Sequence, residues 1–207
     1  MTSSFNSILR AIPASRATLA IVLSISLLAT GCSAQWISVA LSDLPVLTQM
    51  ALNIGTIVTT MQSGRQISAG DGAAIQNISI QASKDLNLLQ ALYYQYKANP
   101  CASALQKIQN AIAEMNQNLP ALLQAAHIGN PVLSARIGAA VNLILTTVAS
   151  FAALIPQTSS RFAAQATSRQ PVVVPTPGNL KRQWNQQVCG PTSNSALNFA
   201  TAGCAIH

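Results

Sequence analysis

Cysteine is the residue type whose spacing in this chain points most directly to covalent chemistry. Cys101, Cys189 and Cys204 lie in the part of the chain that follows residue 100. Thiols pair in oxidising compartments, and the stretch between Cys189 and Cys204 is rich in Gly, Pro, Ser and Asn, so it bends easily. A bridge there closes a loop of about 16 residues and contributes about 3 kcal/mol in the chain-entropy model. We predict the Cys189–Cys204 disulfide, with bridges from Cys101 to either partner as the alternatives.

Cys101 is then a free thiol in the first turn of a helix. A helix N-terminus lowers the pKa of a thiol, so a reactive cysteine is one interpretation. The sequence favours the other interpretation, in which Cys101 is a small residue buried at the end of a helix.

Histidines and acids are few and dispersed. His127 ends a helical segment, where the helix dipole favours its charged form, and His207 is the last residue. Asp43 and Asp71 stand at expected helix starts, whereas Asp85 and Glu114 have lysine neighbours. No catalytic or metal-binding spacing is present in the sequence, so we expect no enzyme activity, no metal and no cofactor.

These residues must be positioned by helices, because apolar residues recur at steps of three and four from Asp43 to Ile155. Turn signals at Ser63-Gly64, Pro100 and Gly129-Asn130-Pro131 divide this region into four segments. We expect the first helix to start at Ser42 or Asp43 and the second at Ser68. The third should start with Asn99 as its cap and Pro100 as its first helical residue. Short connections between long helices predict an all-α fold, an up-down-up-down four-helix bundle over residues 43–155.

Aromatic residues gather near the end of the second segment. Tyr93 and Tyr96 fall on its apolar stripe, whereas Tyr94 points elsewhere. Two core rings and one surface ring are the favoured interpretation, and a patch of Tyr93, Tyr94 and Tyr96 for a protein partner is the alternative. Trp36 suits either the lipid headgroup layer or packing beneath the bundle.

The helical pattern ends after Pro156. Residues 156–207 combine a polar stretch, the extended segment Pro171-Val172-Val173-Val174-Pro175 and few apolar groups. We expect a linker and a small tail that packs on the bundle or stays partly disordered. Because we expect few core contacts from it, truncation after Ile155 should leave the bundle folded.

Only 7% of the residues are charged, compared with about 25% in average proteins. Nucleic-acid binding requires a dense basic stripe with aromatic platforms, and the four cations after residue 155 are dispersed over some 20 residues, so nucleic-acid binding is not expected. Weak attraction of these basic residues to anionic lipid headgroups is the favoured interpretation.

The first 32 residues carry an export signal. Arg10 and Arg16 precede the apolar run Ala17–Ala29, which is followed by Thr30, Gly31 and Cys32. The run Leu28-Ala29-Thr30-Gly31-Cys32 resembles the lipobox of bacterial lipoproteins, although Ala29 stands where leucine is commonest. The resemblance implies removal of residues 1–31, acylation of Cys32 and, with Ser33 next, an outer-membrane location facing the periplasm. Cleavage after Ala34 to give a soluble secreted protein is the alternative.

Residues 32–42 are then a membrane-proximal tether, and loss of residues 1–31 lowers the formal net charge from +7 to +5. We expect a lipid-anchored envelope protein with a structural, scaffolding or binding role, whose partners are the bilayer and an unidentified envelope protein. The alternative is a membrane-embedded or pore-forming protein that uses the uncharged residues 137–155.

Overall fold

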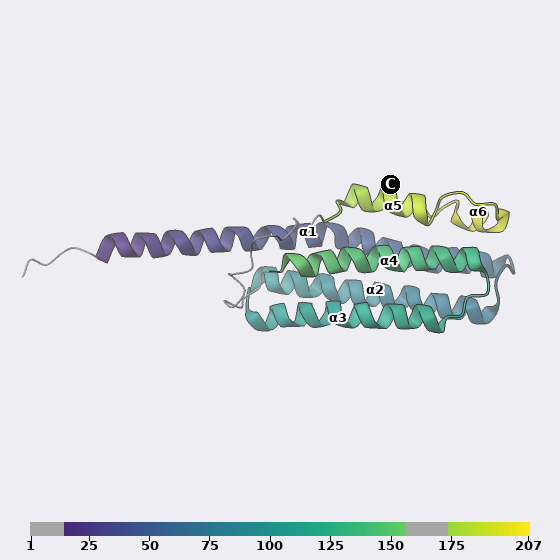
Figure 1. Ribbon diagram of the computed structural model, residues 1–207, viewed down its shortest axis with the longest axis horizontal. Helices are drawn as coiled ribbons and strands as arrows, with labels where there is room; N and C mark the ends of the chain where they lie inside the picture. The colour runs from purple at the N-terminus through teal and green to yellow at the C-terminus, as the bar shows by residue number, and fades with distance from the viewer. Residues whose placement is uncertain (1–14, 156–173) are drawn as a thin grey trace, which may run out of the picture. The chain divides into compact units, whose positions relative to one another are not determined.

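The computed structural model describes the backbone of residues 15–155 and 174–207 and the side chains of residues 36–155 and 174–207. Six helices and no strand occur in this described part, which confirms the predicted all-α class. They are α1 (Ser15–Ser63), α2 (Ala69–Ala98), α3 (Ala102–Ala125), α4 (Pro131–Leu154), α5 (Pro177–Gln187) and α6 (Ser195–Thr201) (Figure 1).

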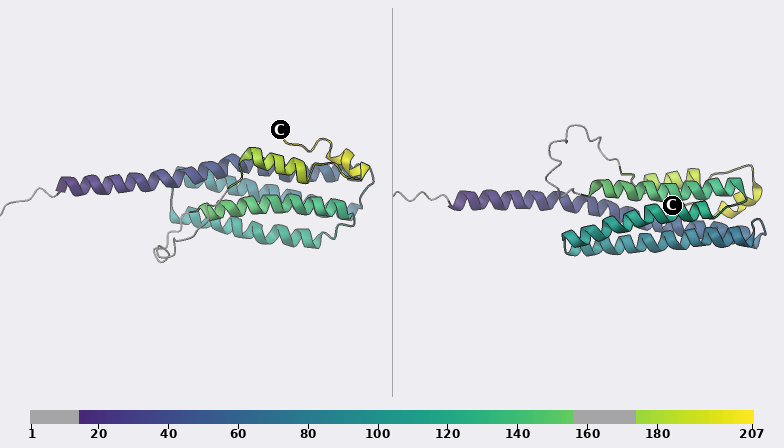
Figure 2. Two further views of the ribbon diagram at one scale, coloured as in Figure 1. Left: turned by 45° about the horizontal axis from the view of Figure 1, so that its top comes forward. Right: turned by 60° about the horizontal axis from the view of Figure 1, so that its bottom comes forward.

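The chain divides into two compact units, Met1–Gln35 and Trp36–His207. The first unit is helical from Ser15 onward. In the second unit, the Trp36–Ser63 part of α1 and the helices α2, α3 and α4 run roughly along one common direction (Figures 1 and 2). The helical core of the protein therefore belongs to the second unit.

The core is built from the apolar stripe of each long helix. Positions three and four residues apart are buried in every one of them, for example Leu47, Ala51 and Ile54 in α1 and Ile108, Ile112 and Met115 in α3. This spacing places each set on one helix face, so the four faces meet in a common apolar interior. The periodicity in the sequence thus identified the buried faces correctly.

The helix boundaries follow from capping chemistry. Ser68 Oγ accepts a hydrogen bond from Asp71 N at 3.0 Å at the start of α2. Asn130 Oδ1 accepts from Val132 N at 3.1 Å and Leu133 N at 3.0 Å at the start of α4, where Pro131 is the first helical residue. These side chains satisfy backbone donors that the helix itself leaves free, which explains why α2 and α4 begin where they do.

The α1–α2 connection is a helix-ending turn with an arginine in the usual glycine position. Gln66 N donates to Met61 O and Arg65 N donates to Gln62 O, each at 2.9 Å. This hydrogen-bond pair is the Schellman motif. Arg65 occupies the position of the motif that has a left-handed backbone conformation, with φ 54°. The chain reverses at Arg65, one residue beyond the Ser63-Gly64 signal.

Two predicted helix starts are wrong. Asp43 and Pro45 lie inside α1, because the apolar stripe continues upstream through Trp36 and Ala40 and the helix continues with it. The third helix begins after Pro100, since Cys101 has extended backbone angles and is the N-cap residue. Neither Asp43 nor Asn99 therefore caps a helix N-terminus.

The expected extended tail is also a wrong prediction for the residues from Pro177 onward, which form α5 and α6. Thr176 and Asn194 cap these helices through their side chains. Leu180, Trp184, Val188 and Leu197 are completely buried. Figures 1 and 2 show α5 beside α1 and α4, so these side chains belong to the common core. The predicted linker lies mostly in residues 156–173, outside the described residues.

Candidate functional site

An aromatic cluster occupies the end of the core where the second unit begins. The Trp36 ring lies 5.5 Å from the Tyr93 ring and 5.9 Å from the Tyr96 ring, centroid to centroid. Tyr93 in turn contacts Phe151 edge-on at 6.4 Å. Trp36 is only 6% exposed, so of its two predicted roles it adopts packing within the bundle. We call Trp36, Tyr93, Tyr96 and Phe151 the aromatic end.

The aromatic end follows Cys32 closely in the sequence. Cys32, the predicted lipidation residue, lies within α1 four residues before Trp36, and its side chain is outside the described part of the structure.

The three tyrosines do not form one surface patch. Tyr93 is completely buried, Tyr96 is half-buried and Tyr94 is 54% exposed. Burial raises the pKa of the Tyr93 hydroxyl, which has no hydrogen-bond partner among the described residues. Tyr93 therefore belongs to the core and Tyr94 to the surface, in agreement with the favoured interpretation, and the alternative of a surface patch of all three residues is wrong.

Asp43 is a buried carboxyl group in the middle of α1. It is fully inaccessible to solvent, and neither carboxylate oxygen accepts a hydrogen bond within the described residues. Burial raises the pKa of Asp43 to about 6, because a charged form cannot be solvated there. Such a group weakens the fold when it is ionised.

The carboxyl-terminal helices are held by a buried cation that the sequence did not reveal. Arg136 in α4 is 6% exposed and donates to Val188 O at 2.5 Å, to Thr201 Oγ1 at 3.3 Å and to Gly190 O. Val188 is the C-cap of α5, so the guanidinium satisfies carbonyl groups at the negative end of that helix. The signal was its position three residues after Leu133, on the apolar stripe.

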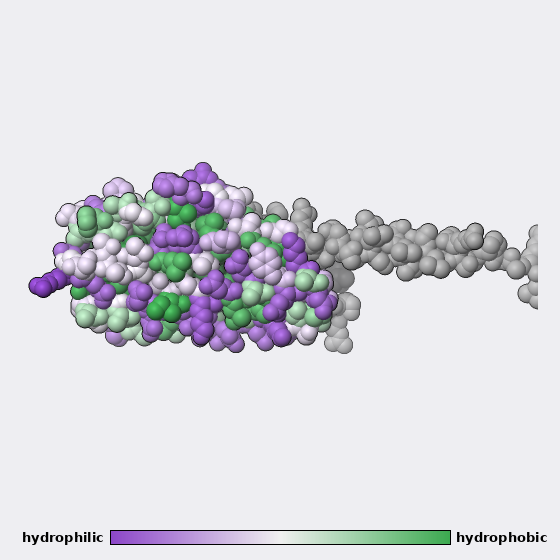
Figure 3. Space-filling model, turned by 180° about the vertical axis from the view of Figure 1, so that it is seen from behind, coloured by the Kyte–Doolittle hydropathy of each residue, from purple (hydrophilic) through white to green (hydrophobic). Residues whose placement is uncertain are grey.

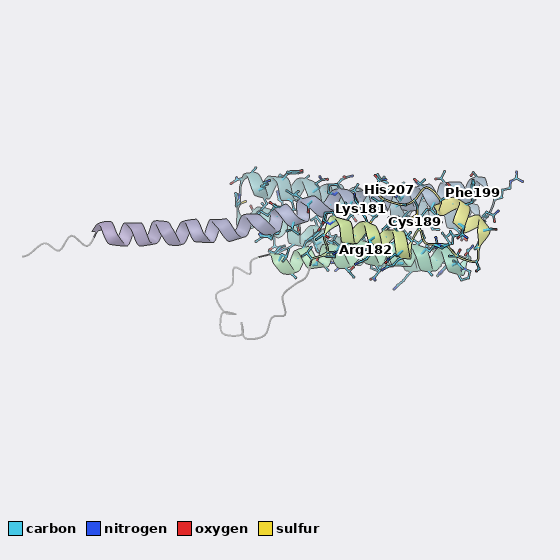
Figure 4. The ribbon with its side chains drawn as sticks, turned by 90° about the horizontal axis from the view of Figure 1, so that it is seen from above. Lys181, Arg182, Cys189, Phe199 and His207 are labelled. Carbon is cyan, nitrogen blue, oxygen red and sulfur yellow. A yellow bond between two sulfur atoms is a disulfide. The ribbon has the colours of Figure 1, made fainter. Side chains whose placement is uncertain are left out.

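Cys189 and Cys204 form a disulfide, in agreement with the predicted pairing. The bridge joins the end of α5 to the last residues of the chain (Figure 4). The Cys204 carbonyl also accepts hydrogen bonds from Trp184 Nε1 at 2.8 Å and from Asn53 Nδ2 of α1 at 3.0 Å. The disulfide thus closes a segment that is itself attached to the core.

Cys101 is a free and exposed thiol. Its Sγ lies 3.3 Å from Ser103 Oγ. This hydrogen bond, and that of the Ala104 backbone, lower the pKa of Cys101. The favoured interpretation of Cys101 as a buried small residue is therefore wrong.

The remaining acidic groups are separated from one another. Asp71 Oδ2 accepts from Gly129 N at 3.2 Å and so ties the start of α2 to the α3–α4 turn. Asp85 Oδ1 accepts from Gln81 Nε2 at 2.7 Å within α2. Among the described residues, no group of three or more His, Cys, Asp or Glu side chains is placed to hold a metal ion.

Two helices within the described residues, Trp36–Ser63 and Pro131–Leu154, are long and apolar enough by length and composition to cross a membrane. Core helices of soluble proteins meet the same criteria. The comparisons with known proteins found no match for this chain among protein-family models, curated proteins or solved structures.

Proposed function

We propose that this chain is a non-catalytic, lipid-anchored protein of the bacterial cell envelope, an up-down-up-down four-helix bundle with a structural, scaffolding or binding role. The observation that carries the proposal is the export signal ending at Cys32 directly before a helical core. The short connections around Arg65, Asn99 and His127 support alternating helix directions, as do the contacts of α2 with α3 and of α3 with α4.

Acylation of Cys32 would set the distance between membrane and bundle. Trp36 is the fourth residue after Cys32, so even a fully extended chain between them keeps Trp36 within about 14 Å of the lipidated residue. The aromatic end then faces the bilayer, and α6 with the α1–α2 turn forms the distal end. Two or three acyl chains make such attachment stable, whereas one gives marginal binding.

The polarity of α4 supports a water-soluble bundle over the membrane-embedded alternative. Asn142 and Thr146 are exposed, whereas Leu143 and Ile144 between them are buried. This alternation is expected for a core helix with one solvent-exposed polar face. It disfavours residues 137–155 as a membrane-spanning segment that faces lipid. Figure 3 shows polar and apolar residues interspersed on one face of the second unit.

The arrangement of the acids supports a role without catalysis. General acid–base chemistry needs groups that converge on a substrate. Asp71 and Asp85 instead make local hydrogen bonds, and Asp43 is enclosed in the core. We propose that the protein acts by contact, with the bilayer through Cys32 and with an envelope protein.

Alkaline extraction of membranes distinguishes the two functions. The chain with Cys32→Ala, exported behind a cleavable signal peptide of the non-lipoprotein type in place of residues 1–31, should appear in the supernatant, because a bundle without acyl chains or signal peptide has no other hold on the bilayer. The chain with Cys101→Ala, a matched change of a free cysteine, should stay in the pellet with the unaltered protein. A Cys32→Ala chain that resists extraction would favour the membrane-embedded alternative.

A further inference from the structure

Helices α5 and α6 are too short to be stable by themselves. They contain 11 and 7 residues, and isolated helices of fewer than about 12 to 15 residues are marginal in water. Their buried side chains, among them Leu180, Trp184 and Leu197, belong to the common core. The two helices therefore fold only when they dock on the long helices.

The Cys189–Cys204 disulfide encloses α6 and the connection between α5 and α6. Cys189 is the second residue after the end of α5, and Cys204 is the third after the end of α6. The two cysteines are 15 residues apart in the sequence, so the bridge restricts the undocked segment and shifts the docking equilibrium about a hundredfold towards the docked form. In the reduced chain this constraint is absent.

The segment closed by the bridge supplies partners to two buried groups. The Arg136 guanidinium donates to the Gly190 carbonyl and the Thr201 hydroxyl, both of which lie within this segment. The Cys204 carbonyl accepts from Trp184 Nε1 of α5 at 2.8 Å. Undocking of the segment would leave a buried cation and a buried indole N–H without these partners, so the release of α5 and the release of α6 are coupled.

The turn after α5 connects the bridge to the Arg136 contacts. Cys189 N donates to Trp184 O at 3.3 Å, and a Cβ atom added at Gly190 would lie 2.6 Å from Gln186 O. The chain thus folds back tightly on the end of α5. Neighbouring residues of this turn form the bridge and contact the Arg136 guanidinium, so both features belong to one docked structure.

We propose that the Cys189–Cys204 bridge is a redox lock, which holds α5 and α6 on the core when it is oxidised and releases both helices when it is reduced. The reductant is a dithiol. It reaches the bridge at Cys189, which is partly exposed, whereas Cys204 is 3% exposed (Figure 4).

The reaction is a thiol–disulfide exchange. One thiolate of the dithiol attacks the Cys189 sulfur and displaces the Cys204 thiolate, which takes up a proton. The second thiolate of the dithiol then displaces the Cys189 thiolate, which is protonated in turn. The bridge gains two electrons and two protons, and the dithiol becomes a disulfide.

Hydrogen–deuterium exchange of the full purified chain, with and without dithiothreitol, tests the lock. We expect the amides of α5 and of α6 to exchange at least about tenfold faster after reduction, while α2 and α3 remain more protected. The chain with Cys101→Ala should respond in the same way, because Cys101 is a free thiol outside the bridge. The inference does not depend on acylation of Cys32.

The chain with both Cys189→Ala and Cys204→Ala separates the bridge from other effects of the reductant. Its α5 and α6 should exchange as fast as those of the reduced chain, and dithiothreitol should not change the rate. Unchanged protection of α5 and α6 after reduction would overturn the proposal, as would release of only one of them. Equal exchange rates in α2, α3, α5 and α6 of the reduced chain would also overturn it, because they would show unfolding of the whole core.

Discussion

At the scale of single residues, two buried charges act in opposite directions. The buried guanidinium group of Arg136 is stabilised by hydrogen bonds that it donates to the Val188 and Gly190 carbonyls and to the Thr201 hydroxyl. Asp43 has no such partners and raises the free energy of the folded state whenever it is ionised.

Asp43→Asn should stabilise the protein in a pH-dependent way. The pKa of Asp43 rises from 3.8 to about 6 on folding, so the unfolded chain ionises first. The destabilisation is absent below about pH 4, grows between about pH 4 and pH 6, and is complete above, at up to about 3 kcal/mol. Denaturant titrations at about pH 7.5 should therefore give a higher free energy of unfolding for the variant than for the unaltered protein. At about pH 4 the two free energies should be equal. The control is Glu114→Gln at an exposed site; a gain independent of pH would refute this role of Asp43.

Arg136→Met should lower the free energy of unfolding by about 2 to 3 kcal/mol, because buried carbonyl groups lose their donor. Arg182→Met is the matched control, since Arg182 is exposed on α5. Its substitution should change stability by less than about 0.5 kcal/mol. Denaturant titration measures both, and equal effects of the two changes would contradict the described role of Arg136.

At the scale of elements, the face assigned to α3 is the part of the fold that the sequence predicts best. Ile112→Asp should destabilise the protein by at least about 3 kcal/mol, because Ile112 is 4% exposed and an unpaired charge would be buried there. Lys107→Ala, on the exposed face of the same helix, should shift stability by less than about 0.5 kcal/mol. Similar melting shifts for the two variants would show that the face is misassigned.

Element boundaries and tertiary roles were harder to predict than helix faces. Periodicity reports only which side of a helix is apolar, so it placed Ile112 and Tyr93 but not the start of α1, where the stripe passes through Asp43. The sequence also undervalued α5 and α6, whose short amphipathic segments bury Trp184 only because α1 and α4 already present a surface. The position of Arg136 on the apolar stripe was a signal of its burial, but its partners could not be predicted because they are mainly backbone carbonyls, which carry no sequence signal.

The tail is therefore expected to stabilise the core. Truncation after Ile155 removes Leu180, Trp184, Val188 and Leu197, each fully buried and each contributing roughly 2 kcal/mol of apolar burial. It also leaves the Arg136 guanidinium without its carbonyl partners. We expect a markedly lower denaturation midpoint by circular dichroism, in contrast to the independence predicted from the sequence. A truncated chain that unfolds at the same midpoint as the full chain would show that α5 and α6 are accessory.

At the scale of the whole molecule, the core of the second unit has an aromatic end around Trp36 and Tyr93, and Trp36 is the fourth residue after Cys32, the predicted lipidation residue, in the sequence. Acylation of Cys32, as proposed, would attach the chain to the bilayer through a residue close to this end in the sequence, and Tyr94 and α6 would then be available for contacts. Phe199 on α6 is 77% exposed and is the most accessible large apolar side chain of the described residues (Figure 4).

The most direct test of the proposed function is mass spectrometry of the amino-terminal peptide of the protein isolated from bacterial membranes. We expect this peptide to begin at Cys32 and to carry the mass of a lipid modification on that residue. A peptide that begins at Gln35 without a lipid, after cleavage at Ala34, or a chain that retains Met1, would contradict the proposal that this helical protein is anchored by Cys32.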